Sequence, residues 1–217
     1  MNKEKQQQQK TLNSSKANEK NISSQIAKKQ QQKKELDKQI QRIINEEVAK
    51  ANNPKTNTNK TMTSTSSSSS SSTSSSSTTD VALSTDFASN KGKLSWPAYY
   101  KSVIREFGRY QHESGGENMS NGIELSTSTG ASVYCVFNGA VSRVFTCPNG
   151  TKGIIIRHGE YMTVYANLSS VNVKEGAKVM TKQTIGTVYT APGASTGELS
   201  FQIWKGTTAQ NPRIWLR

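Results

Sequence analysis

The sequence predicts a mainly β domain that follows a basic, α-helical arm and a flexible linker. Residues 1–60 are rich in Lys and Gln and contain no aromatic residue, and residues 61–79 are Ser and Thr apart from Met62. Residues 91–217 hold every Trp and Tyr and both Cys, in short runs of alternating apolar and polar residues. Because only this last part can bury a sizeable core, we expect the domains 1–60, 61–90 and 91–217.

The arm carries fourteen Lys or Arg and six acidic residues, a net charge of +8. Residues 21–50 are strong helix formers, and the Asn-Asn-Pro run at 52–54 predicts the end of the helix. Its apolar side chains fall on one helical stripe at Ile22, Ile26, Leu36, Ile40, Ile43 or Ile44, and Val48. The stripe is interrupted and covers only about two heptads. It favours a coiled coil or helical hairpin, and a solvated helix that lacks a partner stays open.

The linker begins with the Ser/Thr tract, which has no apolar surface to bury and is expected to be flexible. Leu83 and Phe87 follow at a spacing of four residues, which predicts a short helix ahead of the β domain. The linker would hold the arm near the domain without fixing its orientation.

The apolar runs after Trp96-Pro97 are short and end at turn residues, as in antiparallel strands. They are KSVIREFGR, NGIELST, SVYCVFNGAVSRVF, GIIIRHG, YMTVYANL, VNVKEGAKVMTKQTIGTV and GELSFQIW, and NPRIWL follows as a terminal turn. Asn138-Gly139 predicts a hairpin that joins two of these strands. About nine strands and almost no helix indicate an all-β sandwich or a partly open barrel.

The net charge of +13, of which residues 91–217 carry +7, favours polyanionic partners. The arm has no aromatic residues between its charges, so we expect no nucleic-acid partner. The sequence contains no apolar run of about 20 residues, so we expect no membrane span. The first ten residues lack the apolar core of a secretory signal, so either the protein stays inside the cell or its signal was removed.

The run GELSFQIW, residues 197–204, predicts a strand with one apolar and one polar face. Glu198, Ser200 and Gln202 lie on the polar face, where a zinc hydrolase would place two histidines two residues apart. Three interpretations are open at this point: a metal site, a metal site that has lost its ligands, or a solvated strand face.

Several runs together resemble the LytM-type (lysostaphin-like) zinc endopeptidases of peptidoglycan. They are NGIEL, VYCVFNGAVSRVF, IIIRHGEYMTVYANLSSVNVKEGAKVMTKQTIGTV and GELSFQIWKGTTAQNPRIWL. The resemblance covers roughly residues 92–217 and implies an antiparallel β-sheet domain of the duplicated-hybrid-motif type. The NKGKLSWP lead-in and the basic arm look most like the murein hydrolase activator family (EnvC-like), which pairs a coiled coil with a LytM domain.

Active LytM-type enzymes bind zinc with an H-x-x-x-D motif and the second His of an H-x-H motif, and two further His assist catalysis. In this chain Ser120 and Glu124 stand in the first motif, and Glu198 and Ser200 stand in the second. Asn167 replaces the His of a Tyr-Ala-His-Leu run. The resemblance therefore implies a degenerate groove lined by Ser120, Asn121, Glu124, Asn167, Glu198 and Ser200.

Zinc catalysis requires about three good ligands and an open position for water. Ser hydroxyls are poor zinc ligands and the proton-shuttling imidazoles are absent from these positions, so we expect no enzyme activity, no metal and no cofactor. Weak binding of a hard cation by Glu124 and Glu198 stays open. Of the two histidines, His158 is expected in packing or a turn hydrogen bond and His112 in solvent. Both cysteines are expected to be free, buried thiols, although a bond in an oxidising compartment stays open.

The resemblance implies a non-catalytic activator of murein hydrolases in the periplasm or cell envelope, acting in cell division. Its partner would be a cell-wall amidase bound in the degenerate groove. The arm would recruit the activator to a division complex in the membrane or would inhibit it. Residues 81–90 are a candidate latch over the groove. Two alternatives are a non-catalytic peptidoglycan-binding module and an active zinc endopeptidase of the cell wall.

Overall fold

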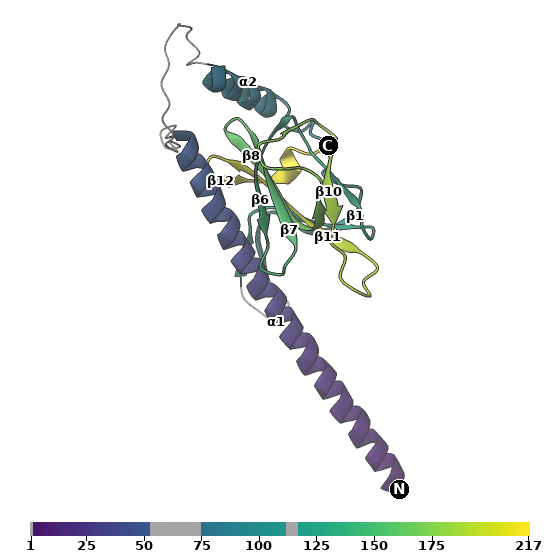
Figure 1. Cartoon of the computed structure of the whole chain (residues 1–217). Coiled ribbons are helices and arrows are strands. Elements are labelled where there is room, and N and C mark those ends of the chain that lie inside the picture. Colours follow the sequence, from purple (N-terminus) through teal and green to yellow (C-terminus); the bar gives the residue numbers. More distant parts are fainter. Residues whose placement is uncertain (1, 53–74, 112–116) are drawn as a thin grey trace, which may run out of the picture. The chain divides into compact units, whose positions relative to one another are not determined.

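The structure is a computed structural model, and it describes residues 2–52, 75–111 and 117–217. These residues form two α-helices, twelve strands and one short 3-10 helix, and Figure 1 shows their arrangement. Their bounds are α1 Asn2–Asn52, α2 Ser75–Ser89, β1 Tyr100–Arg105, β2 Gly108–Gln111, β3 Glu117–Ser120, β4 Ile123–Thr127, β5 Ser132–Tyr134, β6 Gly139–Thr146, β7 Lys152–His158, β8 Tyr161–Val171, β9 Lys178–Val179, β10 Thr184–Val188, β11 Gly197–Lys205, β12 Thr208–Gln210 and η1 Pro212–Ile214. None of the described helices is long and apolar enough to cross a membrane.

The chain divides into two compact units within α1, one that ends at Ile40 and one that runs from Gln41 to Arg217. The helix begins well before the predicted 21–50, because the Lys, Gln and Glu of the first twenty residues are also good helix formers. It ends two residues before Pro54, as predicted. Ile22 is exposed, whereas Ile44 in the second unit is fully buried. The coiled coil stays a prediction.

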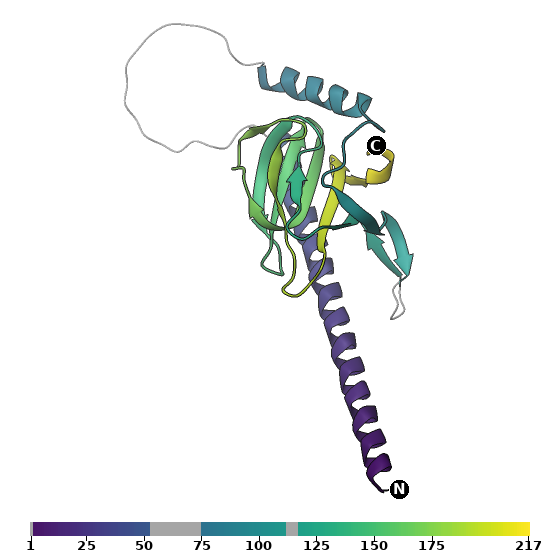
Figure 2. The same cartoon turned by 90° about the vertical axis from the view of Figure 1, so that its right-hand side faces the viewer.

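The main sheet of the second unit has ten strands. Its strands run in the order β1-β4-β11-β8-β7-β6-β9, with β10 joined to β5 and β8, and β12 joined to β11. The separate two-stranded ribbon of β2 and β3 stands out from the main sheet in Figure 2. All pairs between named strands are antiparallel, which confirms the predicted mainly β, antiparallel domain behind a long helix.

The hairpin predicted at Asn138-Gly139 is wrong, because β5 pairs with β10 while β6 pairs with β7 and β9. Asn138 instead binds two other segments. Its carbonyl oxygen lies 2.7 Å from His158 Nδ1, and its side-chain oxygen accepts from Thr181 N at 2.8 Å. A Cβ at Gly139 would lie 2.4 Å from Arg157 O, so the glycine permits the close approach of β6 to β7.

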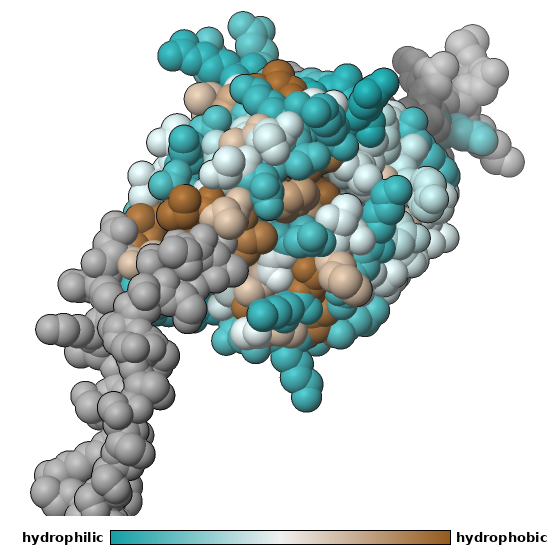
Figure 3. Space-filling model, turned by 90° about the horizontal axis from the view of Figure 1, so that it is seen from above, coloured by the Kyte–Doolittle hydropathy of each residue, from teal (hydrophilic) through white to brown (hydrophobic). Residues whose placement is uncertain are grey.

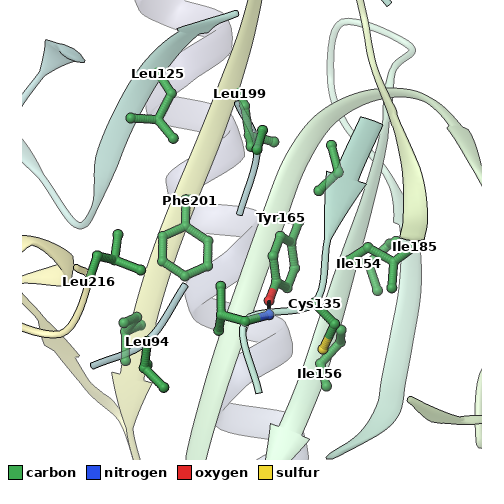
Figure 4. Packing of buried hydrophobic residues seen from close by; sticks show 14 of the residues in the cluster. Leu94, Leu125, Cys135, Ile154, Ile156, Tyr165, Ile185, Leu199, Phe201 and Leu216 are labelled. Carbon is green, nitrogen blue, oxygen red and sulfur yellow. Dashed lines mark hydrogen bonds between the residues drawn. The ribbon is translucent and has the colours of Figure 1, made fainter. Parts of the chain in front are cut away.

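The core lies on the apolar face of β11, where Leu199, Phe201 and Ile203 are fully buried. Figure 4 shows Phe201 beside Tyr165 of β8, and their ring centroids are 5.2 Å apart. The Tyr165 hydroxyl accepts a hydrogen bond from Val136 N at 3.1 Å, so this buried polar atom is satisfied. Both cysteines are buried and free. The apolar face predicted for this strand is therefore the core face.

Phe87 of α2 packs in the same core. Its ring stacks on His158 and Tyr161, with centroids 4.9 and 4.8 Å away, and lies 5.1 Å from Trp215. The short helix predicted from Leu83 and Phe87 is confirmed, and it begins at Ser75, within the Ser/Thr tract. The rest of that tract lies outside the described residues.

The surface seen in Figure 3 mixes small apolar patches with hydrophilic side chains. Tyr99 is the most exposed of the large apolar residues recorded on the described surface, at 84%. It directly precedes β1, at one edge of the main sheet.

Candidate functional site

Strands β4 and β11 bring Glu124 and Ser200 together. The two residues lie directly opposite each other in the antiparallel register, and Glu198 lies opposite Ser126. Side chains at directly opposite positions point to the same face, with their Cβ atoms about 5 Å apart. Three of the predicted groove residues, Glu124, Glu198 and Ser200, are thus gathered on one face of the sheet.

Asn167 joins this group from β8. Its neighbour Ala166 lies directly opposite Ser200. The backbone of Asn167 has φ 69°, a left-handed conformation that Asn tolerates better than most residues. Its Nδ2 donates to Glu198 O at 2.6 Å, and its Oδ1 accepts from Asn149 Nδ2 at 3.2 Å. The side chain therefore ties β8 to β11.

Ser120 ends β3, and Asn121 begins the turn that leads into β4. The buried Ser120 hydroxyl donates to Gly122 O at 2.9 Å, and Asn121 is half-buried. A Cβ at Gly122 would lie 2.2 Å from Phe201 O, so the turn approaches β11 closely only because this residue is Gly. The Ser120 proton is thus engaged within its own turn.

Arg105 is the site residue that the sequence did not reveal. Its Nε donates to Glu124 Oε2 at 2.9 Å, and its guanidinium lies over the Tyr110 ring, 4.0 Å from the centroid. The side chains of Arg105 and Glu124 are only 24% and 19% exposed. They also face each other across β1 and β4, so the sheet register fixes the ion pair. The alternating pattern of KSVIREFGR predicted a strand, but it could not predict that Arg105 pairs with Glu124.

This set of donors does not suit zinc. Zinc takes thiolate, imidazole or carboxylate ligands, and here it would find hydroxyls, an amide and two carboxylates. One of these carboxylates, Glu124, is paired with a guanidinium whose permanent charge repels a metal cation. Across the described part of the chain, no three His, Cys, Asp or Glu side chains form a group suited to a metal.

The later residues on the Ser200 face of β11 are not solvated. Gln202 and Trp204 follow Ser200 on the same face and are both buried, with Trp204 Nε1 donating to Gln202 Oε1 at 3.0 Å. The interpretation as a solvated strand face therefore holds only near the start of the strand, where Glu198 is exposed.

The end of α1 is anchored to β6 and β7 within the second compact unit. The Glu47 carboxylate accepts hydrogen bonds from Ser142 and from Arg143 Nη2, the latter at 3.3 Å. The Glu47 carbonyl accepts from Arg157 Nη2 at 2.9 Å. Burial raises the pKa of Glu47, but the hydrogen bonds from Ser142 and Lys50 and the nearby cations outweigh it, and the pKa is lowered. The anchored carboxylate is therefore charged at neutral pH.

This anchor lies on the same face of the sheet as the predicted groove residues of β11. Arg157 is directly opposite Met162, and Met162 is directly opposite Trp204. Trp204 and Ser200 both alternate with the core residues of β11, so they share the face that Arg157 uses to bind α1. The last turns of the arm and the predicted groove thus occupy one surface of the sheet.

Residues 81–90 do not cover this surface. Ser84 Oγ accepts from Glu160 N at 2.6 Å, and Phe87 is buried against Tyr161 at the start of β8. Asn167 comes six residues later in β8, about 20 Å along an extended strand. The structure places this segment away from the candidate groove, with Phe87 buried in the core.

His158 has the packing role that the sequence predicted. Its Nδ1 lies 2.7 Å from Asn138 O and its Nε2 lies 2.9 Å from Thr163 Oγ1. Burial lowers its pKa to about 4, although the Asn138 carbonyl partly opposes this. The ring is therefore neutral at pH 7. His112 lies outside the described residues.

Residues 118–212, which include all six predicted groove positions, match the Peptidase family M23. Cell division protein DipM of Caulobacter vibrioides is 27% identical over 126 residues, which are 57% of this chain and 20% of that protein. An uncharacterized protein of Neisseria meningitidis serogroup B is 32% identical over 108 residues, 49% of this chain and 18% of that protein. The chain thus spans about a fifth of the length of these curated relatives.

A zinc-containing peptidase from Vibrio cholerae has a similar structure, with a TM-score of 0.50 and 23% sequence identity. The match covers 57% of this chain and 40% of that one. This likeness concerns the fold, and the family match concerns residues 118–212. The chain therefore contains a Peptidase M23 (LytM/lysostaphin-like) domain that is distantly related to DipM.

Proposed function

We propose that this chain is a non-catalytic activator of peptidoglycan hydrolases that acts in the cell envelope during cell division. One observation carries the proposal: Arg105 sets a permanent cation 2.9 Å from Glu124, the carboxylate at a metal-ligand position of the family. Membership of the domain in the M23 family supports a role at the cell wall. The similarity to a cell division protein supports the process.

The groove formed by Glu124, Asn167, Glu198 and Ser200 would bind a cell-wall amidase rather than a peptide substrate. Glu198 is exposed beside Ser200, and its carboxylate offers an anion to a basic or hydrogen-bonding segment of the partner. Asn167 holds the β11 backbone at this position through its bond to Glu198 O. A rigid polar edge of this kind suits recognition of a protein segment.

The arm would regulate access to this surface. Its last turns are anchored by Glu47 on the face of the sheet that also carries the groove residues. The anchor combines the polar contacts of Glu47 with the burial of Ile44, and a partner that binds the arm more tightly would replace both. A membrane-bound division complex that binds the arm would thereby expose the groove to the amidase.

A pull-down with the amidase of the same organism tests the groove, together with dye release from labelled sacculi by that amidase. We expect Glu198→Lys to abolish both binding and activation, because it places a cation where the partner meets a carboxylate. Glu160→Lys is the matched control, since Glu160 is exposed at the β7–β8 turn and makes the same charge change. Equal binding by wild type and Glu198→Lys would refute the groove.

A peptidoglycan-binding module is the second candidate, and the net charge of +7 on residues 91–217 favours it. Sedimentation with purified sacculi at low and high salt separates the two functions. Co-sedimentation that salt weakens, without any effect on the amidase, would support the module. Dye release by the chain alone, sensitive to chelators, would instead identify an active endopeptidase.

A further inference from the structure

A pocket lies beside β1, and none of its lining residues belongs to the predicted groove. It is a pocket of about 430 Å³ between the segment that precedes β1, the end of β5, the loop after β9 and the C-terminal residue. This volume is within the usual range of small-molecule pockets, about 300–1,000 Å³. Its aromatic lining residues are Trp96, Tyr99, Tyr100 and Tyr134, and its charged lining residues are Lys182 and Arg217.

The walls of the pocket are fixed by backbone hydrogen bonds. Tyr134 N donates to Pro97 O at 2.7 Å, and Lys182 N donates to Cys135 O at 2.7 Å. Arg217 N donates to Leu94 O at 2.9 Å. Four separate segments are therefore held against one another before any ligand arrives, which lowers the entropic cost of binding.

The aromatic side chains form two pairs. The Trp96 and Tyr100 rings are 4.3 Å apart, and the Tyr99 and Tyr134 rings meet edge to face at 6.0 Å. Tyr99 is 84% exposed, so most of one ring of the pocket is open to an incoming group. Aromatic rings that are rigid and accessible supply contact area at a low cost in side-chain entropy.

The two charged side chains that line the pocket are both cationic. They are Lys182 and Arg217, and among the described residues no acidic side chain lines it. Lys182 adopts φ 65°, a left-handed conformation that costs a non-Gly residue free energy. The backbone bond from Lys182 N to Cys135 O holds this turn at the wall of the pocket.

We propose that this pocket binds a peptide that ends in a free carboxylate and carries an apolar side chain next to it. The carboxylate would pair with Lys182 and Arg217, and the apolar side chain would lie between the Trp96–Tyr100 and Tyr99–Tyr134 pairs. A neutral sugar fits less well, because it brings no negative charge to Lys182 and Arg217, whereas a carboxylate forms charge-assisted hydrogen bonds with both. The proposal is independent of the amidase groove.

Titration of the 15N-labelled full chain with acetylated dipeptides tests the proposal by NMR. The probes end in Ala, Leu or Phe as free acids, and the matched probes are their C-terminal amides. We expect saturable shifts of the Trp96 indole signal and of the Tyr99 and Lys182 amides with the acids. The amides should bind at least about tenfold more weakly, because they lose the charge-assisted contacts.

Lys182→Gln and Arg217→Gln should each weaken binding of the acids about fivefold to tenfold. Lys178→Gln is the control, because Lys178 is an exposed lysine of β9 outside the pocket lining and its loss changes the net charge equally. Thermal unfolding of each variant checks that the fold is intact. Equal binding of acids and amides, shifts elsewhere in the domain, or no shift with any probe would overturn the proposal. Stronger shifts with a neutral chito-oligosaccharide would assign the pocket to glycan instead.

Discussion

Arg105 and Glu124 face each other across β1 and β4, with Nε 2.9 Å from Oε2. The guanidinium is held from its other side by the Tyr110 ring at 4.0 Å. Since Arg cannot lose its proton in a protein, this position keeps a positive charge at every physiological pH. An internal cation thus neutralises the carboxylate that would otherwise be available to a metal.

The first prediction concerns metal binding. A variant with Ser120→His, Glu124→Asp and Ser200→His restores three ligands of the family motifs. We expect it to bind zinc only weakly while Arg105 remains, because the guanidinium repels the metal and holds the carboxylate. Adding Arg105→Ala should raise zinc affinity at least about tenfold, since two unit charges 4 Å apart interact by about 4 kcal/mol near a protein surface. Competition with a chelating dye measures the affinity.

Arg109→Ala in the same triple variant is the control for this comparison. Arg109 is exposed and pairs with Glu117 at 3.7 Å, so its loss changes the net charge without opening the site. If Arg109→Ala raised zinc affinity as much as Arg105→Ala, the local role of Arg105 would be wrong. Circular dichroism establishes that each variant is folded before zinc is added.

The second prediction concerns the arm. Glu47→Gln removes the negative charge that Ser142 and Arg143 bind, and should weaken docking of residues 41–52 by about 1–2 kcal/mol. Hydrogen exchange with mass spectrometry should show faster exchange in this segment. Glu46→Gln is the control, because Glu46 is more exposed and lies 3.4 Å from Arg143 alone. The two variants should therefore differ, and equal exchange would contradict the anchor.

The third prediction concerns the boundary of the domain. Phe87→Ala should lower the free energy of unfolding by about 3–5 kcal/mol, because the ring is fully buried among four other rings. Val81→Ala in the same helix, at a highly exposed position, should change it by less than about 0.5 kcal/mol. A shortened chain that begins at residue 91 lacks Phe87 and should be destabilised similarly. Denaturant unfolding compares all three with the full chain.

The sequence predicted the parts of the site that follow from strand periodicity. Alternation in GELSFQIW placed Glu198 and Ser200 on one face, and the family motifs placed Glu124 on a neighbouring strand. The pairing of Arg105 with Glu124 was not predictable in this way, because it depends on the register between two strands. Nothing in the local pattern near either residue records that register.

Long-range contacts, rather than the local sequence, determine the conformation at Asn138-Gly139, where a hairpin was predicted. The dipeptide is typical of a tight turn, yet both oxygens of Asn138 are used by other segments, namely His158 and Thr181. Gly139 allows β6 to approach Arg157 O and does not form a left-handed turn.

The alternating pattern of GELSFQIW also could not show that Gln202 is buried. A two-residue pattern does not reveal what covers the second face of a strand.

The last prediction is a pH dependence set by His158. The Asn138 carbonyl can only accept, so Nδ1 carries the proton and Nε2 accepts from the Thr163 hydroxyl. Protonation would put a second N–H into this buried site, against Thr163 and beneath the Phe87 ring. Burial therefore lowers the pKa of His158 from its usual 6.5 to about 4. The unfolded chain binds this proton more readily than the folded chain throughout that interval.

Because the unfolded state holds more protons between pH 6.5 and about 4, stability must fall as the pH falls through this window. One group of this kind contributes a slope of about 1.4 kcal/mol per pH unit, which ends below the folded pKa. His158→Gln, whose amide can donate to Asn138 and accept from Thr163, should remove most of this slope between pH 7.5 and 5. The lowered pKa of Glu47 affects stability only in more acidic solution, so this range separates the two groups. Urea unfolding at half-unit pH steps measures the difference, and parallel pH profiles for wild type and variant would show that His158 does not set the acid sensitivity.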